Sequence, residues 1–152
     1  MSDDRDLVIS RLIAAPRAAV YRCWTDPALI VRWFTLAPFE TIRADLDVRP
    51  GGASRLTMRA PDGAEWENRD TYLEVVPNER LVLTDAYTSG WEPSDNPFMT
   101  VVLTFEDDAG QTRYTARVRH WKVEDCKSHA EMGFAARWEA ATDALAVLAA
   151  TQ

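Results

Sequence analysis

The sequence has few of the residues that hold metals or form disulfides. It contains only two cysteines, Cys23 and Cys126, and two histidines, His120 and His129, among its 152 residues. The cysteines form no C-x-x-C motif, and the spacing of the histidines matches no structural zinc pattern. We therefore predict free thiols in a reducing compartment, and no metal or other cofactor.

Long apolar runs are also absent, and we expect no secretory leader. The longest apolar run, Ala144–Ala150, is far shorter than the roughly 20 residues that span a bilayer. Met1–Asp6 lacks the basic region, followed by an apolar stretch, that begins a signal peptide. These features predict a cytoplasmic protein that does not insert into membranes.

Basic residues are outnumbered by acidic ones. The chain has 17 lysines and arginines against 24 aspartates and glutamates, which leaves a net charge of -7. Such a chain repels a nucleic-acid backbone or an anionic membrane surface on average. We therefore expect no nucleic-acid partner.

The chain does contain enough apolar sequence for a packed core. Its hydrophobic fraction is 47%, with 6 tryptophans, 4 tyrosines and 5 phenylalanines. A chain of this length buries roughly 70% of the surface that its unfolded form exposes. Because no repeat or linker divides it, residues 1–152 are predicted to form a single domain with room for a cavity.

The N-terminal part predicts one strand followed by two short helices. Leu7–Ile13 is mostly apolar and β-branched, and Pro16 suits the first turn of a helix. Apolar residues recur at helical spacing over residues 19–24, and Asp26 with Pro27 then provides a cap and a first helical residue. The second helix is predicted to carry Leu29, Ile30, Trp33 and Phe34.

The middle of the chain changes to the period-two pattern of half-buried strands. Between residues 42 and 48 the even-numbered positions are apolar and the odd-numbered ones are polar, so Ile42 is predicted to face the core. Turn residues such as Pro61-Asp62-Gly63 separate the later segments, which pair naturally as antiparallel hairpins. The predicted strands are 42–48, 55–59, 65–76, 80–87, 99–106 and 111–121.

The C-terminal part predicts one long helix, because no proline interrupts Asp125–Leu148. One face carries Phe134, Trp138, Ala141, Leu145 and Leu148, and the other carries Glu131, Arg137, Glu139 and Asp143. If the sheet curls around this helix, the apolar faces of the sheet and of the helix are both buried. This predicts an α+β domain with a curved antiparallel sheet of about six to seven strands. The long loop Thr88–Phe98 is expected to be functional or mobile.

Several short stretches together carry a resemblance to one family. They are Ala15-Pro16, Trp24-Thr25-Asp26-Pro27, Trp33-Phe34, Arg49-Pro50-Gly51-Gly52, Tyr72-Leu73-Glu74 and Gly133-Phe134. Nearly the whole chain resembles the activator of heat-shock-protein-90 ATPase homologue-like family, within the START-like or SRPBCC superfamily. The resemblance implies a helix-grip fold, in which a curved sheet holds the C-terminal helix and a cavity lies between them. It implies no catalytic set, because the family includes co-chaperones and handlers of lipids or aromatic polyketides.

The polar residues of the predicted strands leave catalysis open. The sequence has no nucleophile elbow, phosphate loop or paired-histidine motif, which argues against an enzyme. His120 shares the apolar face of its strand with Tyr114, and it needs a partner to act as a base. The possible partners are Asp85 and Asp70. The family often has a glycine at the position of Asp70. A structural or solvent-facing role is the alternative for each.

Nine side chains are candidates for the lining of the cavity. They are Trp33, Trp66, Tyr72, Asp85, Trp91, Tyr114, His120, Phe134 and Trp138. Aromatic rings with polar tips suit an apolar pocket that has a few polar groups. Packing in the core is the alternative for most of them, and Trp91, in a loop rich in glycine and proline, is a candidate lid.

Two functions of different classes follow. The first is a small-molecule binding module that takes an apolar or aromatic ligand, lipid-like or polyketide-like, between sheet and helix. The second, implied by the family name, is a protein-interaction module that regulates the ATPase of a heat-shock-protein-90 type chaperone. We expect no room for the additional domain that eukaryotic co-chaperones of this kind carry, which favours the first. The composition is compatible with a monomer or a homodimer.

Overall fold

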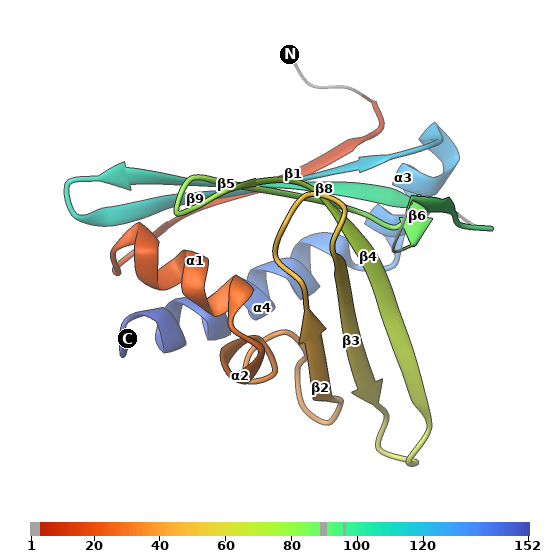
Figure 1. Ribbon diagram of the computed structural model, residues 1–152, viewed down its shortest axis with the longest axis horizontal. Coiled ribbons are helices and arrows are strands. Elements are labelled where there is room, and N and C mark those ends of the chain that lie inside the picture. Colours follow the sequence, from red (N-terminus) through yellow and green to blue (C-terminus); the bar gives the residue numbers. More distant parts are fainter. Residues whose placement is uncertain (1–3, 89–90, 96) are drawn as a thin grey trace.

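The computed structural model describes residues 4–88, 91–95 and 97–152 and contains one large antiparallel sheet (Figure 1). The strands of this sheet are β1 (Asp6–Ile13), β2 (Glu40–Leu46), β3 (Ala53–Arg59), β4 (Glu65–Val76), β5 (Arg80–Thr84), β8 (Met99–Asp108) and β9 (Gln111–His120). Their order across the sheet is β1-β9-β8-β5-β4-β3-β2. The helices are α1 (Arg17–Thr25), α2 (Pro27–Ile30), α3 (Val123–Glu131) and α4 (Phe134–Ala149).

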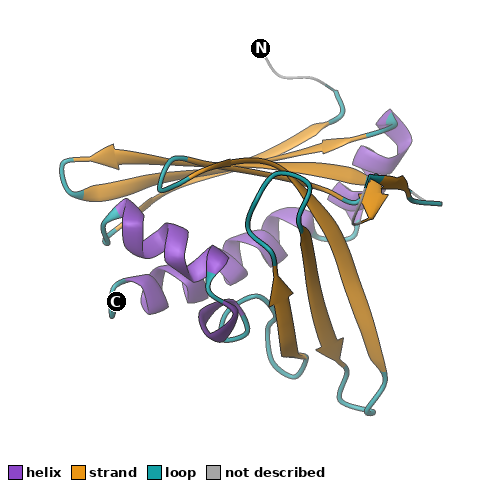
Figure 2. Ribbon diagram, in the orientation of Figure 1, coloured by secondary structure: helices purple, strands orange, loops and turns teal. Residues whose placement is uncertain are grey.

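The sheet is strongly curved, and helices occupy its concave side. In Figure 2 the strands β2, β3 and the outer part of β4 stand at a steep angle to β1, β9 and β8, while α1, α2 and α4 lie in the space between. Arg11 of β1 forms ion pairs with Glu139 and Asp143, which fix one side of α4 against the edge of the sheet. The predicted α+β helix-grip architecture is confirmed.

Alternation along β9 decides which residues enter the core. Tyr114, Ala116 and Val118 are at most 1% exposed, whereas the arginines that alternate with this face, 113, 117 and 119, lie toward the convex side. Leu145 of α4 is fully buried against this layer. The period-two prediction is therefore confirmed for this strand, and it places the tyrosine ring on the concave side.

The predicted uninterrupted helix over Asp125–Leu148 is wrong. The chain instead forms α3 and α4, separated at Met132 and Gly133. Gly133 has a φ of 92°, a left-handed conformation that glycine adopts without a steric penalty and that ends a helix. The break lets α3 pack beside the end of β9 while α4 crosses the concave face.

Two further predictions near the N-terminal half need correction. Ile42 is 38% exposed and Thr41 is buried, because a register shift between Thr41 and Arg43 reverses the faces at the start of β2. The second short helix ends at Ile30, so Trp33 and Phe34 follow it rather than belong to it. The predicted cap is confirmed, since the Asp26 side chain accepts a hydrogen bond from the Ala28 amide.

The predicted loop Thr88–Phe98 falls partly outside the described residues, at 89, 90 and 96. Its described part includes a short antiparallel pair of β6 (Tyr87–Thr88) and β7 (Glu92–Pro93). Within the described ranges, no helix has the length and apolar character needed to cross a membrane.

Candidate functional site

Three adjoining hollows lie between the concave face of the sheet and α4, and together we call them the groove. The inner hollow has a volume of about 50 Å³, the middle one about 220 Å³ and the outer one about 400 Å³. Phe34 lines all three, and Trp138 lines the inner and middle ones. Because the middle hollow shares lining residues with both of the others, the three adjoin one another and form one candidate site.

Aromatic rings from α1 and from the segment after α2 form the wall of the middle hollow. Trp24 meets Trp33 edge to face with ring centroids 4.9 Å apart, and Phe34 lies 5.8 Å from Trp33. The indole nitrogen of Trp24 donates to the Tyr114 hydroxyl, and that of Trp33 donates to the Cys23 carbonyl. With these polar tips bonded inside the protein, the rings offer the groove mostly apolar surface.

The inner hollow contains a half-buried carboxyl group, that of Asp70. Asn68, Asp70 and Tyr72 follow one another on the same face of β4, and all three line this hollow. Burial raises the pKa of Asp70 to about 7, with a smaller contribution from the nearby Asp85 carboxylate. No hydrogen bond from the described residues offsets these effects. Near neutral pH the group can therefore both donate and accept a hydrogen bond.

The neighbouring Tyr72 closes the inner end. Its ring is 1% exposed, and burial raises the pKa of its hydroxyl to about 12 despite a hydrogen bond with Ser54. The phenol is therefore neutral at physiological pH. The inner hollow thus has polar groups in a small space that is otherwise walled by apolar side chains.

A cation, Arg137, lines the middle and outer hollows. Its side chain is exposed and forms no ion pair with any residue that the structure describes. The helical pattern places Arg137 on the polar face of α4 with Glu139 and Asp143, and its exposure agrees with this. It precedes Trp138 at the border of the two faces, and its long side chain reaches the edge of the groove.

Five of the nine predicted candidates line the groove. The inner hollow is lined by Tyr72 and Trp138. The middle hollow is lined by Trp33, Tyr114 and again Trp138, and the outer hollow is lined by Trp66. Trp66 is 45% exposed and meets Phe39 edge to face in the lining of the outer hollow. Phe34, whose segment was expected to line the cavity, lines all three hollows. Sequence reasoning missed Arg137 and Ala141 as lining residues, and only the apolar spacing of α4 pointed to Ala141.

The other four candidates do not line these three hollows. Asp85 accepts hydrogen bonds from the backbone amides of Phe98 and Met99, at 2.9 and 3.1 Å, and so holds the start of β8. Phe134 is buried beside Trp138 and His129. Trp91 packs against Gly51 and Tyr87, where any side chain on Gly51 would approach its indole nitrogen. Its proposed role as a lid stays a prediction.

His120, the fourth of these, belongs to a separate cluster at the end of β9. Its Nδ1 lies 2.8 Å from the Arg5 carbonyl, and its Nε2 lies 2.8 Å from His129 Nδ1. Both ring nitrogens are therefore occupied, and neither Asp70 nor Asp85 is its partner. Burial, followed by the influence of His120 and Arg137, lowers the pKa of His129 to about 4.

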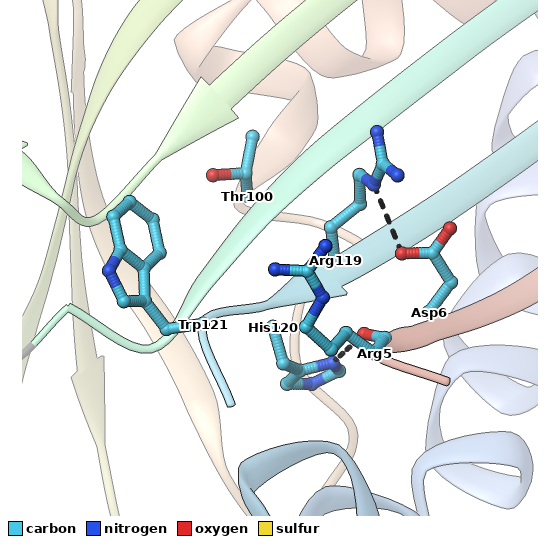
Figure 3. A pocket seen from close by; sticks show the side chains of 6 residues that line it. All are labelled: Arg5, Asp6, Thr100, Arg119, His120 and Trp121. Atoms are coloured by element: carbon cyan, nitrogen blue, oxygen red, sulfur yellow. Dashed lines mark hydrogen bonds and ion pairs between the residues drawn. The ribbon is translucent and has the colours of Figure 1, made fainter. Parts of the chain in front are cut away.

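His120 also lines a polar hollow of about 360 Å³ at the ends of β1, β8 and β9 (Figure 3). In this hollow the Asp6 carboxylate bonds Arg119 at 3.1 Å, and it also bonds Arg117. Its acidic and basic groups thus pair within the protein. The groove is the better candidate site, because its walls are apolar and its two charged groups are not paired with each other.

Comparisons with known proteins agree with the fold. Residues 14–150 match the family model described as activator of Hsp90 ATPase homolog 1-like protein. A crystal structure of a protein from Nitrosomonas europaea is similar at 32% identity, with a TM-score of 0.93 over 97% of this chain and 96% of that one. The solution structure of an AHSA1-like protein from Aeromonas hydrophila, at 22% identity, covers 94% of this chain and 90% of that chain with a TM-score of 0.74. No curated protein matches the sequence significantly.

Proposed function

The chain belongs to the family of activator of Hsp90 ATPase homolog 1-like proteins, and on this premise we propose that it binds an apolar or aromatic small molecule in the groove. The family and the START-like fold support a ligand-binding or regulatory module in general. The observation that carries the narrower proposal is the apolar, aromatic wall of the middle hollow, next to the half-buried carboxyl group of Asp70. Concave apolar sites with few polar groups are the usual sites for small molecules.

The groove also suits a ligand because its polar atoms are already arranged. The indole nitrogens of Trp24 and Trp33 are bonded to protein acceptors, so an apolar body entering the groove leaves neither of them newly unpaired. Asp70 and Arg137 remain as groups that can orient a ligand. The proposal is one of binding, and no catalytic step is assigned to these residues.

Ligand binding predicts stabilisation of the folded state. A ligand at 100 times its dissociation constant adds about 2.7 kcal/mol to the free energy of unfolding. For a domain of this size that raises the Tm by about 5–10 °C. Thermal-shift screening of apolar acids, sterols, fatty acids and aromatic polyketides tests this, and native mass spectrometry of protein purified from its own source tests for a retained molecule. A broad screen without a hit, and a protein that carries nothing, would contradict the proposal.

The family name favours a second candidate, regulation of a heat-shock-protein-90 type chaperone. This function predicts that the isolated protein stimulates the chaperone's ATPase. The stimulation should be measured with the groove empty and with a bound hit from the screen. Stimulation that is unchanged by the ligand makes protein interaction the primary function, and stimulation that the ligand abolishes makes the groove its regulator.

A further inference from the structure

The two unpaired charged groups of the groove lie in different sections of it. Asp70 lines the inner hollow only, and Arg137 lines the middle and outer hollows only. The aromatic wall of Trp24, Trp33 and Phe34 lies along the middle section. A ligand that fills the groove therefore meets an acid at its inner end and a cation at its outer end.

The inner section limits what can reach Asp70. Its volume of about 50 Å³ is the smallest of the three hollows. Only the narrow end of a ligand therefore reaches Asp70. Asn68 and Tyr72 flank the same space, so hydrogen-bond donors and acceptors are both present.

A neutral hydroxyl group fits this inner end best. It can accept a hydrogen bond from one of these groups and donate one to another. A carboxylate there would face the Asp70 carboxyl and the Asp85 carboxylate beyond it, and any full charge would lose its water. The inner end therefore excludes an anion.

The outer end has the opposite character. Arg137 is exposed at the edge of the groove and has no ion-pair partner in the described part of the chain. A guanidinium group binds a carboxylate with two parallel hydrogen bonds. An anion placed here keeps part of its hydration, which lowers the cost of binding it.

We propose that the ligand is an amphipathic carboxylic acid that enters with its apolar body first, placing its carboxylate at Arg137 and a hydroxyl group at the far end of the body beside Asp70. This inference rests on the proposed function and adds the chemical class and the orientation of the ligand. It assigns separate roles to two residues at the two ends of one molecule. Each role can therefore be removed without the other.

The test uses three flexible probes that differ only at their ends: ω-hydroxydodecanoate, dodecanoate, and the methyl ester of ω-hydroxydodecanoate. Dissociation constants are measured by isothermal titration calorimetry for the wild type, Arg137→Gln and Asp70→Leu. Arg55→Gln serves as the matched control, because Arg55 is exposed on the opposite face of β3 and lines none of the three hollows. A flexible chain is chosen because it adjusts to the separation of the two ends.

The wild type is expected to bind the hydroxy acid about fivefold more tightly than either other probe. Arg137→Gln should abolish the preference for acid over ester and keep the preference for the hydroxyl group. Asp70→Leu should do the reverse, and Arg55→Gln should change neither. Two independent losses of this kind identify two separate contacts.

Three results overturn the inference. One is equal binding of all three probes by the wild type, and another is an equal loss of acid binding in Arg55→Gln, which would show an effect of net charge alone. The third is a hit of another chemical class in the thermal-shift screen while none of the three probes binds. In all three cases the proposed function stands. The proposed function fails together with the inference only if neither the probes nor any compound in the screen binds.

Discussion

The indole nitrogen of Trp24 donates a hydrogen bond to the Tyr114 hydroxyl, 3.2 Å away, and this bond joins α1 to β9 at the wall of the groove. The two residues are 90 positions apart in the sequence and both are buried. Burial raises the pKa of Tyr114 above its usual range, so the hydroxyl stays neutral and remains a good acceptor.

Tyr114→Phe should therefore destabilise the protein by about 1–3 kcal/mol, because it leaves the buried indole N–H without an acceptor. Chemical denaturation followed by tryptophan fluorescence measures the change. Tyr87→Phe is the control, since Tyr87 is 37% exposed and its variant should stay within about 0.5 kcal/mol of the wild type. Equal stability of the two variants would show that the Trp24 bond contributes nothing.

The raised pKa of Asp70 predicts an unusual dependence of stability on pH. The folded state keeps its proton up to about pH 7, whereas an unfolded aspartate releases it near pH 4. Between these values the folded state binds more protons, so the free energy of unfolding falls as the pH rises. Asp70→Asn removes this loss and should be more stable than the wild type at pH 8, by on the order of 2–4 kcal/mol.

The difference between Asp70→Asn and the wild type should shrink as the pH falls and vanish below about pH 3, where Asp70 is protonated in both states. Urea denaturation at a series of pH values gives the two curves. Parallel curves from pH 4 to pH 8 would mean that Asp70 titrates normally and is not buried as described.

His129 is expected to change the pH dependence of stability in the opposite direction to Asp70. Its pKa of about 4 in the folded state lies below the ordinary value of 6.5, so the unfolded state binds the extra proton between these values. The free energy of unfolding therefore falls as the pH falls through this range. Because Asp70 masks the trend, we expect a clear acid loss of stability in Asp70→Asn that the added change His129→Gln abolishes. An acid loss that survives in the double variant would assign it to other groups.

The sequence predicted the fold better than it predicted the site. Alternation in β9 is readable because one face is fully buried, and it correctly placed Tyr114 on the concave side. The apolar periodicity ran the helix through Gly133, because glycine interrupts such a pattern without the visible signal of a proline, whereas the family resemblance correctly has Gly133-Phe134 open the last helix. The shift at Thr41 likewise depends on pairing with β3, which a single strand does not reveal.

The site was harder to predict because it is formed by contacts between segments that are distant in the sequence. Asp70 was recognisable as a possible inward-facing acid from its spacing to Tyr72, but its raised pKa comes from burial by other elements. Arg137 looked like an ordinary solvent-facing residue of an amphipathic helix. Its place at the edge of the groove follows from where the segment after α2 lies, which no local pattern contains.

The most direct test of the groove as a binding site is a fluorescence titration with the apolar dye anilinonaphthalene sulfonate. Ala141 lines the middle and outer hollows, so Ala141→Trp fills them, while Ala136→Trp makes the same change on the exposed side of α4. Circular dichroism checks that both variants fold. We predict that the wild type and Ala136→Trp bind the dye with the same affinity and that Ala141→Trp loses at least tenfold. Equal binding by the folded Ala141→Trp variant, or no binding by the wild type, would contradict a ligand site between the sheet and α4.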